Sequence, residues 1–266
     1  MSKVIIAEGN DIAKRTYLAL KELNPAMPKE GEKILIKPNL VEPMSNESGA
    51  ITRKETVEGI IQFFGDKKYE IVIGEGAGIQ NTKKCFEKAG YFELEQKYRV
   101  KLVDLNISDF VAVKGNYWNF EISKFAKEFY LISAAVLKEH AFEVTLSIKN
   151  LMGVLKPKAN YSTKSYMHVE YDEGFQNGRE IWAKRLFDLA RIAKPKIAII
   201  DATTAMYGSH LFGKLKTLNL TLASEDALAC DLVGAKLLGH EKVFYLEQAL
   251  KEGLGKKPEK IVKVYT

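Results

Sequence analysis

Short runs of apolar residues alternate with helical patterns along the first third of the chain. Runs of aliphatic residues bounded by charged residues or glycine are typical of strands buried on both faces. Such runs lie at Val4–Ala7, Ile34–Ile36 and Ile71–Ile73. Patterns with helical periodicity follow them at Asp11–Leu23, Thr52–Phe64 and Thr82–Lys88. This alternation predicts an α/β protein with a mostly parallel, doubly wound sheet in its N-terminal third.

Between residues 100 and 148 the pattern changes to short extended runs with little helical periodicity. Such runs predict additional mixed or antiparallel strands in the middle of the chain. Further on, the sequence predicts a helix at Glu180–Ala193, a strand at Ile197–Ile200 that ends at Asp201, and a helix that begins near Ser224. We expect residues 1–266 to form a single α/β domain, although two intimately packed lobes satisfy the same pattern.

A long polar segment precedes the helix predicted at Glu180–Ala193. Between Gly153 and Gly178 the chain is rich in asparagine, serine and threonine and lacks a periodic apolar pattern. Loops of this length are uncommon in compact domains unless they serve a site. We predict that the segment forms a lid, with His168 in solvent as the favoured placement and His168 over the site as the alternative.

The net charge indicates which kinds of molecule the protein binds. Lysine and arginine total 40 against 34 aspartates and glutamates, a formal charge of +6 that attracts anions at long range. Nucleic-acid interfaces usually contain basic runs with aromatic residues between them, whereas the longest basic runs here are pairs. The sequence favours a small anionic molecule and disfavours nucleic acid. A structural alternative is a solvated lysine- and glutamate-rich surface of the kind found in thermophilic proteins.

Cysteine usage and hydropathy predict a soluble cytoplasmic protein. Cys85 and Cys230 are far apart and form no CxxC motif, so we expect no self-contained iron–sulfur cluster. No window reaches the roughly 20 apolar residues of a membrane span, and the first residues lack the apolar core of a signal peptide. A homo-oligomer is compatible with the sequence, although no feature specifies one.

Polar groups that follow buried strands are the first candidates for a site. Lys37 and Asn39 come directly after a strand in the segment ILIKPNLVEP, and Glu75 and Gly76 follow the next strand in IGEGAG. The carboxyl ends of parallel strands meet at one edge of a sheet, where ligands commonly bind. These four residues are therefore candidate ligand-binding residues. The alternatives are a lysine that extends into solvent and a tight turn between strand and helix.

The segment richest in candidates is LKEHAFEVTLSIKNLMGV, which holds Lys138, His140, Lys149 and Asn150. Ammonium and amide donors around one apolar strand suit the binding of an oxyanion. Lys138 and Asn150 are therefore candidate ligand-binding residues. His140 and Lys149 are candidate catalytic residues that transfer a proton. A histidine with only structural hydrogen bonds is the alternative for His140.

Three aspartates are candidate metal ligands. Asp201 is expected at a strand end, and Asp226 and Asp231 lie in the segment ASEDALACDLVGAKLLG. Carboxylate oxygens of this kind hold Mg²⁺, which makes magnesium the cofactor that the sequence suggests. Asp226 also fits a favourable charge in the first turn of a helix, and Asp231 an ion pair with a lysine. We find no motif of a classical hydrolase in the sequence.

The ordered set of these segments resembles the family catalogued as domain of unknown function 362. The matching stretches run from about residue 33 to YLEQALKEGLGKKPEKI near the C-terminus. The resemblance implies no established activity, and it marks as motif positions Lys37, Asn39, Glu75, Lys138, His140, Lys149, Asn150, Asp226 and Asp231. Some members are fused to ferredoxin-like iron–sulfur modules, but this sequence has no cysteine quartet. The stretch after Asp201 also departs from the aspartate- and glycine-rich sequence expected there.

Two hypotheses about function follow. In the first, the protein is an enzyme whose lysine-rich cleft fixes a carboxylate or phosphate while His140 or Lys149 transfers a proton. In the second, it is a non-catalytic protein that binds an anionic metabolite or docks to a redox partner. Both hypotheses require lysines from distant segments to meet in one cleft.

Overall fold

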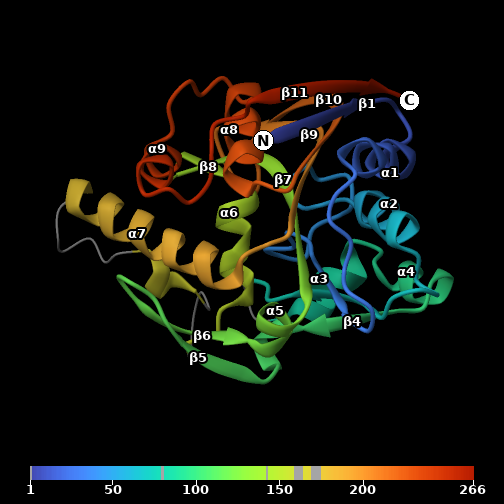
Figure 1. Cartoon of the computed structure of the whole chain (residues 1–266), viewed down its shortest axis with the longest axis horizontal. Coiled ribbons are helices and arrows are strands. Elements are labelled where there is room, and N and C mark those ends of the chain that lie inside the picture. The colour runs from blue at the N-terminus through green and yellow to red at the C-terminus, as the bar shows by residue number, and fades with distance from the viewer. Residues whose placement is uncertain (1, 79–80, 142, 159–163, 169–174) are drawn as a thin grey trace.

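The computed structural model describes residues 2–78, 81–141, 143–158, 164–168 and 175–266. Its main feature is a large sheet that crosses the molecule (Figure 1). In their order across the sheet, the strands are β11 (Lys260–Tyr265), β1 (Lys3–Glu8), β10 (Lys214–Ser224), β9 (Ile197–Tyr207), β7 (Tyr130–His140), β2 (Ile34–Lys37), β3 (Ile71–Glu75) and β4 (Val100–Asp104). A further strand, β8 (Glu143–Thr145), pairs with β7 beside this path.

Neighbouring strands in most of the sheet run parallel. The parallel block consists of β9, β7, β2, β3 and β4. β10 is antiparallel to both β9 and β1, and β11 runs parallel to β1 at the far edge. The predicted α/β class with a mostly parallel sheet is therefore confirmed.

The strand partners add detail that local patterns do not contain. β1 lies between β10 and β11 and is not a neighbour of β2. β7, from the middle of the chain, is a central parallel strand of the large sheet. Antiparallel pairing in the middle of the chain is found in β8 on β7 and in the hairpin of β5 (Phe110–Lys114) and β6 (Asn119–Ser123).

Helices cover both faces of the sheet, as in doubly wound folds (Figure 1). One face carries α1 (Ile12–Leu23), α2 (Lys54–Phe64), α3 (Thr82–Lys88) and α4 (Phe92–Lys97). The other carries α6 (Ser147–Asn150), α7 (Phe175–Ala193), α8 (Ala227–Leu237) and α9 (Phe244–Lys251). Because successive side chains of a strand point to opposite faces, Leu35 packs with the second group, whereas Ile34 and Ile36 pack with the first.

Short helical segments complete the connections between these elements. α5 (Lys124–Glu128) follows β6, and three 3-10 turns lie at Leu105–Ile107, Leu151–Val154 and Ser165–Met167. The predicted lid includes residues 159–163 and 169–174, which lie outside the described residues. Among the described helices, none combines the length and the apolar character that crossing a bilayer requires.

β9 is longer than the sequence predicts. It continues to Tyr207, so Asp201 lies inside the strand, and the expectation that Asp201 ends it is wrong. The residues after Asp201 include Thr203 and Thr204, whose branched side chains favour extended backbone. Thr204 pairs with Thr217 of β10, which keeps the strand in the sheet. The extension carries the β9–β10 hairpin, and with it His210, toward the ends of the parallel strands.

Candidate functional site

A cavity lies at the edge of the sheet where β2, β3 and β7 end. β2 ends in Lys37, β3 in Glu75 and β7 in His140. The carboxyl ends of these strands share one edge because the strands are parallel. α6, which carries Lys149, contributes to the wall of this cavity. The cavity has a volume of about 160 Å³.

The cavity brings together all the residues that the sequence marks for ligand binding or catalysis. They are Lys37, Asn39, Glu75, Gly76, Lys138, His140, Lys149 and Asn150. The structure adds Lys164 and His210 to the lining, which sequence reasoning missed. It also places His168 in the lining, so the favoured expectation that this side chain lies in solvent is wrong.

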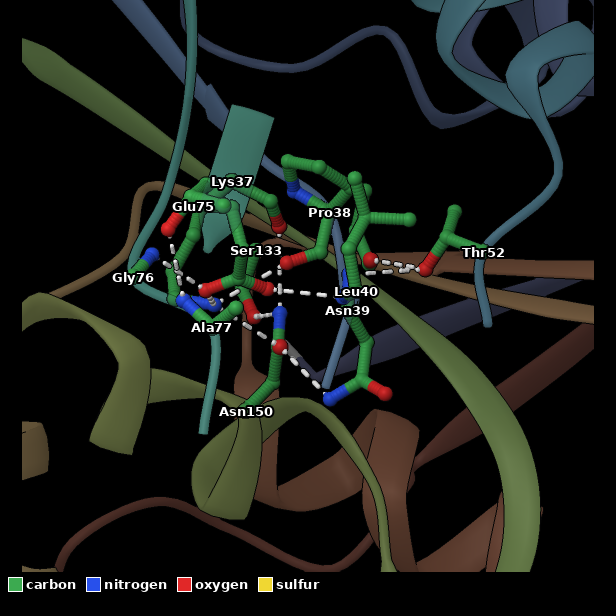
Figure 2. Close-up of polar contacts among 12 residues, drawn as sticks. Lys37, Pro38, Asn39, Leu40, Thr52, Glu75, Gly76, Ala77, Ser133 and Asn150 are labelled. Carbon is green, nitrogen blue, oxygen red and sulfur yellow. Dashed lines mark hydrogen bonds and ion pairs between the residues drawn. The ribbon is translucent and has the colours of Figure 1, made fainter. Parts of the chain in front are cut away.

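The floor of the cavity is a hydrogen-bonded network around Lys37 (Figure 2). The ammonium of this buried residue donates to Glu75 Oε1 at 2.7 Å, to Asn150 Oδ1 at 3.0 Å and to the carbonyl oxygen of Pro38 at 2.9 Å. Burial lowers the pKa of Lys37, and the Glu75 carboxylate opposes this effect. Since an ammonium has three donors, Lys37 has already used all of them.

The partners of Lys37 are themselves held in place. Glu75 Oε2 accepts a hydrogen bond from the backbone N–H of Leu40 at 2.8 Å. The Asn150 amide donates to the Lys37 carbonyl oxygen and to Ser133 Oγ, both at 3.1 Å. These bonds tie β2, β3, β7 and α6 together beneath the cavity. Lys37, Glu75 and Asn150 therefore act as its support, and direct contact with a ligand stays a prediction for them.

Glycine at two positions allows this floor to close. A side-chain carbon at Gly153 would overlap Lys37 Nζ and Glu75 Oε1. A side-chain carbon at Gly76 would overlap the carbonyl oxygen of Gly153 and Lys164 Nζ. The backbone therefore approaches the charged groups more closely than any other residue type permits.

Two buried lysines in the wall have used only part of their hydrogen-bonding capacity. Lys138 Nζ donates to Asn39 Oδ1 at 2.9 Å and to the Ala50 carbonyl oxygen at 2.5 Å. Lys164 Nζ donates to the Gly76 carbonyl oxygen at 2.7 Å and to Asn106 Oδ1 at 2.5 Å. Burial lowers the pKa of both lysines to about 7. Each retains one N–H beyond the bonds formed with the described residues.

Lys149 differs from the other lysines of the cavity. Within the described part of the chain its half-buried ammonium has no hydrogen-bond or ion-pair partner. Burial lowers the pKa of Lys149 to about 8. A buried cation without a counter-charge is costly, so its presence in a cavity points to a partner of opposite charge.

Asp231 holds the turn that presents Lys149. Its carboxylate accepts hydrogen bonds from the backbone N–H of Ser147 at 2.8 Å and of Ile148 at 2.9 Å, and also from Ser147 Oγ. It thereby caps the first turn of α6 from the neighbouring helix α8. Burial raises the pKa of Asp231 to about 7. The expected ion pair of Asp231 with a lysine is replaced by these bonds.

Three histidines lie together in the cavity lining. The ring of His140 is 4.5 Å from that of His210 and 6.0 Å from that of His168, measured between ring centres. Burial, followed by nearby lysines, lowers the pKa of His140, and it lowers the pKa of His168 and of His210 to about 4. All three rings are therefore neutral at pH 7, and each then has one donor and one acceptor nitrogen.

Thr145 adds a polar atom without a partner. This residue of β8 is 3% exposed and lines the cavity. Its Oγ1 makes no hydrogen bond to any other residue that the structure describes. Buried hydroxyls are normally satisfied, so this hydroxyl is available to a molecule in the cavity.

The glycine-containing turn after β3 uses its backbone donors internally. The N–H of Gly76 donates to Glu75 Oε1 at 2.7 Å, that of Ala77 to Thr82 Oγ1 at 3.2 Å, and that of Gly78 to the Val41 carbonyl oxygen at 3.0 Å. Phosphate-binding loops instead direct such N–H groups at the ligand. The lining therefore offers an anion its side chains and not this backbone.

The three candidate metal ligands have separate structural partners. Asp201 accepts from the N–H of Arg53 at 2.9 Å and lies 3.8 Å from the buried guanidinium of Arg15. Asp226 is the N-cap of α8 and accepts from the N–H of Ala229 at 3.1 Å, whereas the sequence places it in the first turn. Across the described residues, no group of three or more histidines, cysteines, aspartates or glutamates is arranged to hold a metal ion. The structure thus does not bring Asp201, Asp226 and Asp231 together as a site.

Fold and site together define an α/β protein with a lysine-lined cavity at the carboxyl ends of parallel strands. The chain belongs to the family described as a domain of unknown function (DUF362), whose sequence profile matches residues 34–236. The matched region contains every residue of the cavity floor and wall discussed above.

Individual proteins extend this comparison. The thylakoid-associated protein sll1697 of Synechocystis sp. is 25% identical over 233 residues, which are 86% of this chain and 70% of that protein. Among solved structures, the lactate racemase apoprotein from Thermoanaerobacterium thermosaccharolyticum matches with a TM-score of 0.52 and 17% identity. That match covers 88% of this chain but only 56% of the racemase. It shows a common fold.

Proposed function

We propose that the protein binds a small organic anion in this cavity and acts on it as an enzyme, with His140 or Lys149 transferring a proton. The observation that carries the proposal is the Lys149 ammonium, which has no partner among the described residues and lines a partly closed cavity. A bound carboxylate supplies the missing counter-charge.

The charges of the lining support an anion. Among the described lining residues, four are lysines (Lys37, Lys138, Lys149 and Lys164) and one carries a carboxylate, Glu75, which is bonded to Lys37. Burial lowers the pKa of the last three lysines, and nearby carboxylates oppose this effect only in part at Lys138 and Lys164. An anion beside them favours their protonated forms and raises these pKa values again. Binding is therefore expected to take up protons near neutral pH.

Size and donor type favour a carboxylate over a phosphate ester. A cavity of about 160 Å³ holds on the order of ten water-sized groups, which suits an acid of a few carbon atoms. The backbone donors that usually surround a phosphate are engaged elsewhere in the turn after β3. The neighbour in fold is a lactate racemase, which makes small hydroxy acids the first compounds to test.

Neutral imidazoles beside a cation suit proton transfer. A neutral ring can accept a proton from a bound acid and return it. Two observations support His140 in this role: its ring lies beside those of His168 and His210, and Lys149 influences its pKa. Binding without turnover in a metabolite screen would instead identify a non-catalytic binding protein, including one that docks to a redox partner.

The test is calorimetric titration with lactate, pyruvate and inorganic phosphate. We expect wild-type protein to bind at least one of the two carboxylates and Lys149→Met to lose most of that affinity. Lys257→Met, which changes an exposed lysine, serves as the matched control. Unchanged affinity in Lys149→Met contradicts the proposal. Titration with and without EDTA separately checks the predicted magnesium requirement, and cell fractionation checks the cytoplasmic location.

A further inference from the structure

The lysines of the cavity differ in whether their nitrogen is available to react. Lys37 donates three hydrogen bonds, and Lys138 and Lys164 donate two each to backbone and amide oxygens. Such bonds fix the positions of these nitrogens and engage them with oxygen atoms of the protein. Lys149 has no such bond within the described residues and faces the cavity. Its nitrogen can therefore approach a bound molecule.

We infer that Lys149 is a nucleophile that captures the carbonyl carbon of a small 2-oxo carboxylate as a Schiff base. This inference rests on the proposed binding of an organic anion in the same cavity. It adds a class of substrate, an acid with a ketone next to the carboxylate, and a covalent role for one residue.

The chemical step is balanced without an oxidant or a further reactant. The neutral amine of Lys149 attacks the carbonyl carbon, and the π electrons of the C=O bond move to oxygen, giving a carbinolamine after proton transfer. The C–O bond then breaks and a C=N bond forms. The oxygen leaves as water and carries both hydrogens that were on the lysine nitrogen. Amine and ketone thus give imine and water.

Other groups in the cavity lining suit this step. Lys138 and Lys164 each retain an N–H for the carboxylate of the substrate. The hydroxyl of Thr145, which bonds to none of the described residues, can donate to the oxygen of the carbinolamine. Neutral His140 can carry the proton between nitrogen and oxygen.

The protonation state of Lys149 also favours the reaction. An ammonium has no lone pair, so only the neutral amine attacks a carbonyl. Before a ligand binds, burial lowers the pKa of Lys149 to about 8, so roughly a tenth of this side chain is the neutral amine at pH 7. An exposed lysine with a pKa near its ordinary value of about 10.4 is almost entirely protonated there. Lysines next to other cations are known to be activated in this way.

The experiment is reductive trapping of the whole protein with pyruvate and sodium borohydride, followed by mass spectrometry and peptide mapping. We expect the reduced pyruvate adduct on Lys149, formed roughly a hundredfold faster than on exposed lysines at pH 7. Lactate, which has a hydroxyl group in place of the ketone and cannot form a Schiff base, should compete with this labelling. Lys149→Arg is the informative variant, because it retains the positive charge and removes the nucleophile.

The outcomes separate this inference from the proposed function. If Lys149→Arg binds lactate in calorimetry but gives no adduct, both are supported, and the lactate binding shows that the variant is folded. Lactate binding to the wild type without any borohydride-dependent adduct overturns the Schiff base and leaves anion binding intact. The Schiff base is also overturned if the amount of pyruvate adduct is unchanged in Lys149→Arg, or if exposed lysines are labelled as fast as Lys149. Absence of both lactate and pyruvate binding overturns the proposed function itself.

Discussion

Two lysines of the same cavity, Lys37 in the floor and Lys149 in the wall, differ in the partners that the fold provides for their ammonium groups. Lys37 is 1% exposed and has an ion pair with Glu75 and three hydrogen bonds in all. Lys149 is half-buried in the cavity wall and has no partner within the described residues. A buried charge that the fold compensates stabilises structure, whereas one left uncompensated indicates a ligand.

The largest expected effect comes from breaking the compensated pair. Lys37→Met leaves the Glu75 carboxylate buried without its cation, which should lower the free energy of unfolding by about 3–5 kcal/mol. Urea denaturation followed by circular dichroism measures this loss. A loss below that of Lys33→Met, which removes an exposed ion pair to Glu70 at 3.0 Å, would show that the floor is not structural.

A smaller effect is expected from crowding the floor. Gly153→Ala places a methyl group against Lys37 Nζ and Glu75 Oε1, and we expect it to cost about 1–3 kcal/mol of stability. Gly78→Ala is the matched control, because its added carbon would lie 3.3 Å from Val41 Cγ2, a contact that needs only a small adjustment. Equal thermal denaturation midpoints for the two variants would contradict the close packing described here.

The lysines of the cavity wall should make anion binding depend on pH near neutrality. Burial lowers the pKa of Lys138 and Lys164 to about 7 and that of Lys149 to about 8, and only their protonated forms attract an anion. Affinity for lactate should therefore fall as pH rises through 7 to 8, by about tenfold per pH unit for each proton that binding requires.

Calorimetry in buffers of different ionisation enthalpy checks this prediction through the protons taken up on binding. Lys149→Arg should remove the part of the fall that centres near pH 8, because a guanidinium stays charged there. An affinity that is constant from neutral to alkaline pH would show that these lysines do not hold the anion.

The position of the cavity could be predicted from the sequence, because strand ends are recognisable in local sequence patterns and parallel strands end at one edge of a sheet. Lys37 and Glu75 follow apolar runs that form β2 and β3, and the carboxyl ends of such strands share an edge. Which lysine is compensated was not predictable, since the Asn150 partner of Lys37 is separated from it by 113 residues. Pairing of that kind depends on tertiary packing and leaves no pattern in either segment.

Other parts of the cavity escaped prediction for related reasons. Lys164 and His168 belong to a polar segment without periodicity, and His210 reaches the cavity only because β9 extends past Asp201. The apolar run that predicts this strand ends at Asp201, whereas the threonines that follow continue the extended backbone. The three aspartates were grouped by residue type, whereas the fold uses Asp226 and Asp231 to cap α8 and α6.

The most direct test of the central claim is the free energy of unfolding of Lys149→Met and wild type at pH 7, measured with and without lactate. Without lactate, the variant should be more stable by about 1 kcal/mol, because it removes an uncompensated cation. With saturating lactate, only the wild type should gain stability. A variant that is destabilised without lactate, as Lys37→Met should be, would contradict the distinction between the two lysines.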